Sequence, residues 1–464
     1  MSPAASTVAC TGCGHPADPR DPYPFRCPKA GTDDVDHVMA RVLDSTRVRF
    51  PRDRDPNPFI RYRELLHSYH LATEAGMSDE DYRALVAELD RAVAAVDGHG
   101  FRATPFSRSV GLADAIGLSA AGGIWAKDET GNVSGSHKGR HLMGLALHLE
   151  VVERIGLTDG SRPPLAIASC GNAALAAAVV AAAAGRELHV FVPVDADPTV
   201  VGRLDELGAH LVVCPRESSV PGDPTYLRLE EALAEGAIPF TCQGNLNGLA
   251  IEGGQTIAYE IAAGLATADE RLDHLVVQVG GGALASACIQ GLREAETLGA
   301  LERMPRIHTV QTASAHPLER AYHLLRAGLS ADPSATELAV AMREAAASRS
   351  AYMWPWEEEP KSVATGILDD ETYDWRAVVA GMLATGGHPA VVDEQALVQA
   401  NDLAVERTGI PVDPTGSSGL AGVLALRREG VIGDDDRVAV LFTGVRRTSG
   451  RDESPVALEG GNHR

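Results

Sequence analysis

The sequence is poor in aromatic residues and in positive charge. Phe, Trp and Tyr make up 5% of the 464 residues, and 41 Lys and Arg stand against 63 Asp and Glu, which gives a formal net charge of −22. A surface of that sign repels both the nucleic-acid backbone and anionic lipids. We therefore expect neither nucleic acid nor a membrane as a partner.

Long hydrophobic runs and paired cysteines are also missing. The longest apolar stretch, residues 165–194, is interrupted by Asn172 and Gly185 and does not resemble a membrane span. No basic region followed by a hydrophobic segment opens the sequence, so we expect no export. The seven cysteines are an odd number, and most lie in predicted strands and helix starts. This pattern favours reduced thiols in a cytoplasmic protein over a disulfide framework.

Three of the cysteines lie close together near the N-terminus. Cys10 and Cys13 are separated by two residues, and Cys27 follows. This spacing is typical of a zinc knuckle that lacks its fourth ligand, which His15 or His37 would supply. The sequence leaves two hypotheses open: a zinc site, or a vestigial knuckle held by packing.

From Thr104 onward, short apolar strands alternate with longer helices. Strands are predicted at residues 165–169, 189–192, 275–279 and 307–311, each followed by a helical pattern. Such alternation indicates parallel sheets with helices on both faces. The predicted fold class is α/β, with two open, mostly parallel twisted sheets, a cleft between them and a short cysteine-containing N-terminal extension. Residues 331–374 are expected to be less regular.

Lys138 is the residue around which we expect a site. It follows the small residues Ser134-Gly135-Ser136 and His137, just before a helical pattern over residues 141–153. Helix starts favour anions, so the charged form of a lysine there is disfavoured. A Schiff base to an aldehyde cofactor requires a neutral amine. Taken alone, the stretch also fits a surface lysine after a Ser-Gly loop.

Three loops at strand ends are candidates to complete the site. The loop Ser169-Cys170-Gly171-Asn172 leads into a helix whose free backbone N–H groups suit a carboxylate. The loop Gly280-Gly281-Gly282-Ala283-Leu284 allows the backbone to close around a phosphate. Thr443 ends a late strand, where ligands bind in open α/β sheets.

A dinucleotide site is the rival interpretation of the glycine loop. Its Gly-x-Gly-x-x-Gly spacing is not met, because Ala285 stands where the third glycine would fall. A compact monophosphate is therefore the better prediction.

Together these motifs resemble the fold-type II family of pyridoxal-phosphate enzymes, in its threonine synthase and threonine dehydratase branch. The resemblance runs from about Thr104 to Arg446, and the N-terminal cysteines and residues 61–66 look like threonine synthases in particular. The motifs that carry it are residues 125–132, 134–138, 169–172, 252–260, 280–284, 412–419 and 443–444.

The resemblance implies a role for each loop. Lys138 would bind pyridoxal 5′-phosphate as a Schiff base and later move the Cα proton. Asn172 would hydrogen-bond the O3′ atom of the cofactor, and the loop from Gly280 to Leu284 would bind its phosphate. The loop from Ser169 to Asn172 would hold the substrate carboxylate. Thr443 would face the pyridine nitrogen, where a hydroxyl favours loss of a leaving group over transamination.

Two departures from the family pattern leave the substrate open. His137 stands where threonine synthases and dehydratases usually carry phenylalanine. Gly139 replaces the aspartate of the Lys-Asp-Arg run of threonine synthases. His137 would lie next to a phosphate, donate a hydrogen bond to a residue that holds the ligand, or serve only in packing. We expect extra cations for a substrate phosphate, with Lys127, Arg140, Arg446 and Arg447 as candidates.

The expected activity is that of a lyase or synthase of amino acid metabolism, with elimination or elimination-replacement at Cβ or Cγ, as in threonine synthase. The alternative is a serine or threonine ammonia-lyase, or a β-replacement synthase on an O-activated serine. Two hypotheses come from other functional classes. One is a catalytically inactive regulatory or binding homologue that keeps the fold, and the other is an NAD-dependent enzyme. A small amino-acid substrate and a homodimer are the expected partners.

The resemblance also predicts a division of the chain. Residues 1–50 form the cysteine-containing extension and residues 51–103 a helical lead-in. Residues 104–138 and 259–464 would form a large cofactor-binding domain, and residues 139–258 a small mobile domain.

Overall fold

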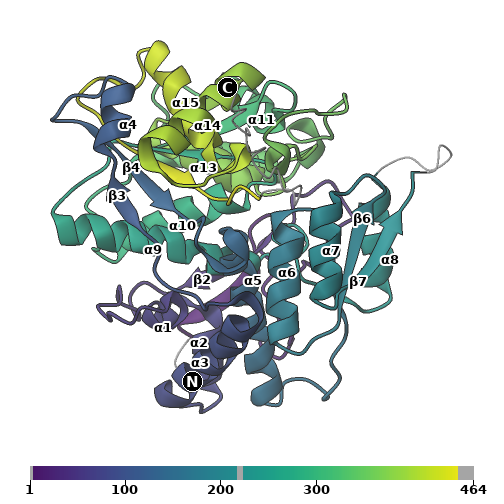
Figure 1. Cartoon of the computed structure of the whole chain (residues 1–464). Helices are drawn as coiled ribbons and strands as arrows, with labels where there is room; N and C mark the ends of the chain where they lie inside the picture. The colour runs from purple at the N-terminus through teal and green to yellow at the C-terminus, as the bar shows by residue number, and fades with distance from the viewer. Residues whose placement is uncertain (1–3, 217–222, 448–464) are drawn as a thin grey trace, which may run out of the picture.

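The computed structural model describes residues 4–216 and 223–447, whose strands form a large sheet, a small sheet and a two-stranded hairpin (Figure 1). Helices cover both sheets. The predicted α/β fold class, with two mostly parallel sheets and an N-terminal extension, is confirmed. The division into domains stays a prediction, and its last residues, 448–464, lie outside the described part.

The large sheet has the strand order β11-β10-β9-β12-β4-β3, and each neighbouring pair is parallel except β3 with β4. Strands β9 and β12 are central and buried, as expected for parallel strands covered on both faces. The strands are β3 (Phe106–Arg108), β4 (Gly123–Asp128), β9 (His274–Gln278), β10 (Arg306–Thr312), β11 (Pro389–Val392) and β12 (Arg437–Phe442).

Alternate side chains of the large sheet enter two separate cores, because successive residues of a strand point to opposite faces. Leu275 and Leu441 pack with one set of helices, and Val276 and Val440 with the other. The first set is α9 (Ala250–Ala268), α10 (Ala283–Thr297), α11 (Pro317–Ala327), α12 (Ala335–Ala346) and α13 (Trp375–Thr385). The second is α4 (Val110–Ala115), α14 (Glu394–Thr408) and α15 (Pro414–Arg428).

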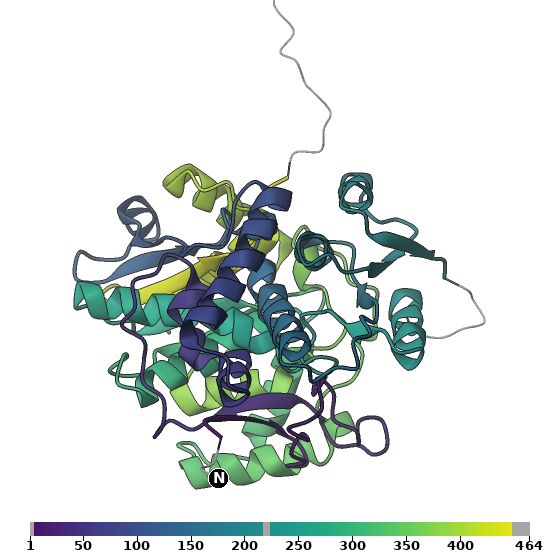
Figure 2. The same ribbon diagram turned by 90° about the horizontal axis from the view of Figure 1, so that it is seen from below.

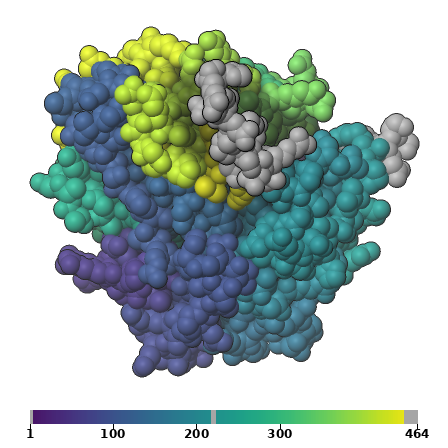
Figure 3. Space-filling model, viewed as in Figure 1, coloured from purple at the N-terminus to yellow at the C-terminus, as the bar shows by residue number. Residues whose placement is uncertain are grey.

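The small sheet is entirely parallel, in the order β7-β6-β5-β8. Its strands are β5 (Leu165–Ala168), β6 (Leu188–Pro193), β7 (His210–Cys214) and β8 (Ile238–Pro239). The surrounding helices are α5 (Lys138–Arg154), α6 (Asn172–Ala183), α7 (Pro198–Glu206) and α8 (Pro224–Ala234). On the face shown in Figure 3, the C-terminal part of the chain (yellow) lies above the part that contains the small sheet and its helices (teal).

The N-terminal part packs against both sheet regions. The antiparallel hairpin of β1 (Ser6–Cys10) and β2 (Met39–Leu43) is drawn in purple in the lower half of Figure 2. The lead-in consists of α1 (Pro58–Arg61), α2 (His67–Glu74) and α3 (Asp79–Asp97). Helix α3 begins after Ser78, whose hydroxyl accepts the Asp81 N–H at 3.1 Å.

The expectation that residues 331–374 lack regular structure is wrong for the first part of the segment. Helix α12 begins after Ser334, whose hydroxyl accepts the Glu337 N–H at 3.2 Å. The Ser-x-x-Glu pattern was therefore present as a helix signal. The remainder contains only the short 3₁₀ turns η3 (Arg349–Ala351) and η4 (Thr365–Ile367). Two further 3₁₀ turns, η1 (Arg63–Leu65) and η2 (Val133–Gly135), precede α2 and α5.

No helix in the described part of the chain has the length and apolar content to cross a membrane.

Candidate active site

Lys138 is the first residue of α5, three residues earlier than the apolar pattern suggested. The turn before it bends through Ser134 (φ 58°) and Gly135 (φ 68°), both in the left-handed region. Ser136 then forms an isolated bridge with Gly444, and the His137 N–H donates to the Thr443 carbonyl at 3.2 Å. The start of α5 is therefore fastened to the carboxyl end of β12.

Two aspartates and a cysteine lie within electrostatic reach of Lys138. Its ammonium group lowers the pKa of Cys242, Asp369 and Asp374, although burial dominates and leaves all three raised. Burial brings the pKa of Cys242 to about 11 and, together with the charge of Asp36, that of Asp374 to about 7. The immediate surroundings of the lysine are thus low in dielectric and carry acidic groups.

The predicted glycine loop meets the same aspartates. A Cβ atom at Gly280 would lie 2.2 Å from Oδ2 of Asp369, and one at Gly281 would lie 2.8 Å from Cδ2 of Tyr373. Gly282 has φ +96°, and a Cβ there would lie 3.1 Å from that of Asp374. Glycine is required at these positions because residues 367–374 pack directly on the loop.

Lys138 and the glycine loop are therefore brought together, with Asp369 and Asp374 beside both. Whether an anionic cofactor group fits here depends on the hydrogen-bond donors that the chain presents. Helix α10 has no side-chain cap, and its first internal hydrogen bond is made by the Ser286 N–H. The earlier backbone N–H groups at Ala283 and Leu284 are donors suited to a phosphate.

The loop before α6 is built in the same way. Gly171 precedes the helix without a side-chain cap, so its first N–H groups are open to a carboxylate. The side-chain oxygen of Asn172 accepts a hydrogen bond from Arg447, which also donates to the Ser134 carbonyl at 2.7 Å. A Cβ at Gly444 would lie 3.0 Å from Nδ2 of Asn172. Asn172 therefore faces the end of β12, next to the turn that carries Lys138.

Thr443 lies where these elements meet. Its hydroxyl accepts a hydrogen bond from Nε2 of Gln278, on β9, at 2.8 Å. The hydroxyl hydrogen of Thr443 remains available to a ligand. The ends of β9 and β12 and the start of α5 are thus linked through one threonine.

Several buried polar atoms near Lys138 have no hydrogen-bond partner. They are Ser136 Oγ, His137 Nε2, His141 Nε2 and Asp374 Oδ2. Burial, and after it the charge of Lys138, lowers the pKa of His141 to about 3 and that of His137 well below its usual value. Unpartnered buried groups need an explanation, and a polar ligand is one that these residues fit.

Two of the expected phosphate-binding cations have another role. Nζ of Lys127 lies 2.5 Å from Oε2 of Glu260, and Arg140 lies 2.7 Å from Glu260 and 2.8 Å from Glu129. All four side chains are almost completely buried. The two cations lower the pKa of Glu260 to about 2 against the opposing effect of burial. Lys127 and Arg140 therefore neutralise the buried Glu129 and Glu260, and the expectation that they reach a substrate is not supported.

The motif at residues 252–260 serves the same helix. A Cβ at Gly253 would lie 2.1 Å from the carbonyl oxygen of Arg140, and one at Gly254 would lie 2.2 Å from the ring of His141. These glycines let α9 cross α5 within one turn of Lys138, so the motif positions the lysine.

The sequence did not single out Asp369 or Asp374. Both belong to the segment of residues 361–374, where no periodic pattern or motif spacing marks them. Only the packing of this segment on the glycine loop brings their carboxyl groups to Lys138.

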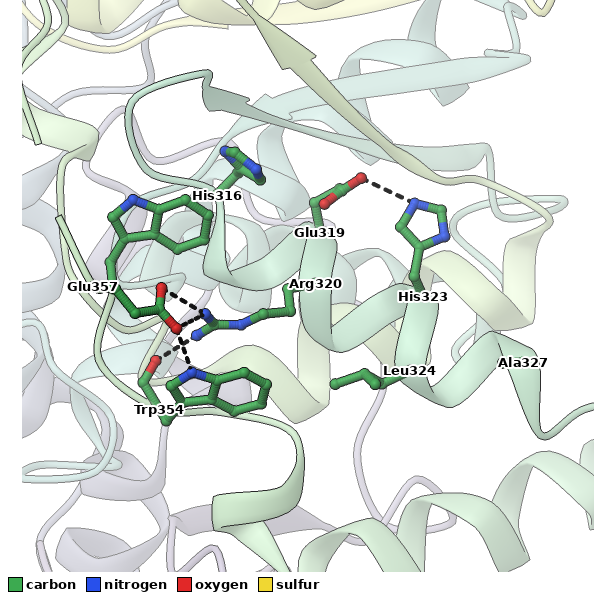
Figure 4. Close-up of a pocket in the computed structure, with 9 residues that line it drawn as sticks. His316, Glu319, Arg320, His323, Leu324, Ala327, Trp354 and Glu357 are labelled. Carbon is green, nitrogen blue, oxygen red and sulfur yellow. Dashed lines mark hydrogen bonds and ion pairs between the residues drawn. The ribbon is translucent and has the colours of Figure 1, made fainter.

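An open pocket of about 610 Å³ lies between α11 and residues 354–357 (Figure 4). The guanidinium of Arg320 lies 3.7 Å from the ring centroid of Trp354, and its charge is paired with Glu357 at 3.0 Å. None of the predicted site residues lines this pocket. A smaller cavity of about 190 Å³ does adjoin the site, since Ser134, Gly135 and Arg447 line it.

The N-terminal cysteines form a group of possible metal ligands. One ligand atom from each of Cys10, Cys13, Cys27 and His37 lies within 4.8 Å of the others. Of the two histidines that the sequence left open, His37 is the one in this group.

The model of the pyridoxal-phosphate dependent enzyme family matches residues 99–444. Among curated proteins, a threonine synthase of Methanocaldococcus jannaschii is 24% identical over 345 residues, covering 74% of each chain. A threonine synthase of Methanosarcina acetivorans is 27% identical over 350 residues, again covering 74% of each.

Solved structures with the same fold have lower identity. Threonine deaminase isoform 2 from Solanum lycopersicum aligns with a TM-score of 0.56 at 14% identity, covering 80% of this chain and 92% of that one. Diaminopropionate ammonia lyase from Escherichia coli aligns with a TM-score of 0.56 at 18% identity, covering 78% and 88%. Maize serine racemase aligns with a TM-score of 0.54 at 19% identity, covering 79% and 94%. At such identity these likenesses concern the fold.

Proposed function

We propose that this chain, which belongs to the pyridoxal-phosphate dependent enzyme family, catalyses elimination or elimination-replacement at Cβ or Cγ of an amino acid, as a threonine synthase does. The relatives named threonine synthase, which cover about three quarters of the chain, favour that reaction over others in the family.

The observation that carries the proposal is the arrangement around Thr443. The His137 N–H, in the turn before Lys138, donates a hydrogen bond to the Thr443 carbonyl. Nε2 of Gln278 donates one to the Thr443 hydroxyl. A neutral hydroxyl at a pyridine nitrogen does not hold the ring protonated, which favours loss of a leaving group. The nearby donors of α10 and α6 supply separate positions for a phosphate and for a carboxylate.

In the proposed mechanism each residue has a defined task. Pyridoxal phosphate, held by Lys138 and by the N–H groups of the loop from Gly280 to Leu284, supplies an electron sink when bound. The N–H groups from Ser169 to Asn172 bind the substrate carboxylate and orient the Cα–H bond. Nζ of Lys138 takes the Cα proton and returns a proton later in the cycle. Asn172 and Thr443 keep the ring in place.

The leaving group needs a proton or a cation. Asp374, whose pKa is raised to about 7 by burial and by Asp36, is a candidate general acid near Lys138. Among the four cations considered, Arg446 donates to Asn401, whereas Arg447 flanks the site through Asn172. We propose Arg447 as the cation for a substrate anion.

One observation favours the second candidate, an ammonia-lyase or a β-replacement synthase. A phosphorylated substrate needs cations beyond those for the cofactor, yet Lys127 and Arg140 are neutralised by Glu129 and Glu260. A serine-derived substrate with a neutral leaving group places no such demand on the site.

From the resemblance we also propose a homodimer in the cytoplasm.

A substrate panel separates the two candidates. Purified protein is incubated with O-phosphohomoserine, threonine, serine, O-acetylserine and O-phosphoserine, while phosphate release, ammonia release and the cofactor absorbance are followed. Phosphate release from O-phosphohomoserine with threonine as product supports the first candidate. Ammonia release from serine or threonine, or turnover of an O-activated serine, supports the second. No spectral change and no turnover with any of the five would overturn both.

A further inference from the structure

The N-terminal cysteine cluster has the dimensions of a metal site. In a tetrahedral zinc site with Zn–S bonds of about 2.3 Å, two sulfurs lie about 3.8 Å apart. The sulfurs of Cys13 and Cys27 are 3.8 Å apart, and Sγ of Cys10 lies 3.4 Å from Nδ1 of His37. All four ligand atoms fall within 4.8 Å of one another.

A carboxylate orients the histidine of the cluster. Nε2 of His37 lies 2.9 Å from Oδ1 of Asp33, so the other ring nitrogen, Nδ1, faces Cys10. This carboxylate–histidine pairing is the usual support of a metal-bound imidazole. The His15 imidazole is not among these ligand atoms, and the His15 residue meets the cluster through its backbone, whose carbonyl accepts the Cys10 N–H at 2.8 Å.

The backbone brings the ligands together without a disulfide. The hairpin pairs Cys10 with Met39, and the Thr11 N–H donates to the Val38 carbonyl at 2.8 Å. A Cβ at Gly12 would lie 2.2 Å from the carbonyl oxygen of Asp36, so a glycine is required for this approach. Cys10, Cys27 and His37 are buried, and the cysteines are free thiols.

From this geometry we propose that Cys10, Cys13, Cys27 and His37 bind one structural zinc ion. We also propose that this ion holds in place residues 367–376, which pack on the glycine loop. Four protein ligands in a closed site suit a structural ion, with no position left for substrate. Three thiolates and one imidazole also fit zinc better than calcium or magnesium, which prefer oxygen ligands.

The connection runs through Asp36, the neighbour of His37. Its carboxylate accepts hydrogen bonds from Nε1 of Trp375 at 3.3 Å and from Nε of Arg376 at 3.0 Å. Arg376 also donates to the carbonyl oxygen of Thr11 at 3.0 Å. The start of α13 is therefore fixed to the residues between the metal ligands.

The same start of α13 closes the glycine loop. The Asp374 N–H donates to the carbonyl of Gly281 at 3.0 Å, and the Thr372 hydroxyl donates to the carbonyl of Gly280 at 2.9 Å. Loss of the ion would free the hairpin loops, then Asp36, and then residues 367–376. This second half rests on the proposed function, in which the loop holds the cofactor phosphate, whereas the zinc site does not.

Metal content tests the first half without any substrate. We expect about one zinc per chain in the purified, reduced protein, measured by elemental analysis. Cys13→Ser, Cys27→Ser and His37→Ala should each lose the metal, whereas His15→Ala, the matched control, should keep it. Cobalt substitution should add the visible bands of thiolate coordination in the wild type and in His15→Ala only. Iron in place of zinc, no metal after zinc is added to reduced protein, or loss in His15→Ala would overturn the site.

Hydrogen exchange tests the second half. Removing the ion with a chelator should speed amide exchange in residues 367–376 roughly tenfold and leave α15 unchanged. Asp36→Asn should keep the zinc, show the same faster exchange and retain less pyridoxal phosphate, while Asp18→Asn, an exposed control, should change none of these. Unchanged exchange after zinc removal would refute the coupling and leave both the zinc site and the proposed reaction standing.

Discussion

The carboxyl group of Asp374 allows the candidate site to be tested through its pH dependence. It is 4% exposed, one of its oxygens has no partner, and burial together with the charge of Asp36 raises its pKa from 3.8 to about 7. In the unfolded chain the same carboxyl ionises near its ordinary value. Replacing Asp374 with asparagine removes the titration and keeps the shape of the side chain.

The direction in which the folding stability changes with pH follows from the number of protons that each state binds. Between pH 4 and pH 7 the folded protein keeps the Asp374 proton that the unfolded chain has lost, so stability falls as the pH rises. Below pH 4 both states are protonated and the penalty is absent. A pKa raised from 3.8 to about 7 corresponds to about 4 kcal/mol, fully present above pH 7. This is a large part of the usual 5–15 kcal/mol of folding stability.

The assay is urea denaturation of the wild type and of Asp374→Asn from pH 4 to pH 8, at matched cofactor content. The variant should gain stability relative to the wild type as the pH rises, by about 4 kcal/mol over this range. Asp402→Asn, at an exposed position, controls for the loss of one negative charge. A difference between Asp374→Asn and the wild type that stays constant with pH, or that changes in the opposite direction, would refute a buried, uncompensated carboxyl beside Lys138.

Three further substitutions test the supports of the site. Arg140→Met leaves its two glutamate partners short of a buried cation, so it should cost about 3–5 kcal/mol in urea denaturation, and a gain in stability would contradict this. Gly253→Ala should destabilise by about 1–3 kcal/mol, since its Cβ would meet a backbone oxygen. Its control, Gly202→Ala, has open space and a helical position, and should stabilise by about 1 kcal/mol. Arg447→Ala should raise KM roughly tenfold with unchanged cofactor content, because Asn172 and the substrate anion lose a charged donor; an unchanged KM would exclude that role.

Much of the fold could be predicted from local patterns. The strands at residues 165–169 and 275–279 are β5 and β9 within a residue or two, because buried parallel strands form short apolar runs between glycine turns. The family resemblance is confirmed by the match over residues 99–444. Helix α12 was missed although Ser334 and Glu337 marked its start.

The site was only partly accessible from sequence, because its chemistry depends on contacts between distant segments. Lys138 and the glycine loop were singled out as candidates by their own motifs. The direction of a charged side chain was not, and Arg140 points into a buried ion cluster instead of a cleft. Asp369 lies 89 positions beyond Gly280, and only the path of the chain from α12 to α13 brings them together. Likewise, the choice of His37 over His15 required the pairing of β1 with β2.

Central to the proposed function is that Lys138 would bind pyridoxal phosphate and that the loop from Gly280 to Leu284 would bind its phosphate group. The most direct measurement is the absorption spectrum of the purified protein, followed by borohydride reduction and peptide mapping. A yellow protein whose reduced cofactor is found on the peptide with Lys138, and a colourless Lys138→Ala variant, are the expected results. Purified protein that stays colourless with added pyridoxal phosphate, or a cofactor found on another lysine, would contradict the account.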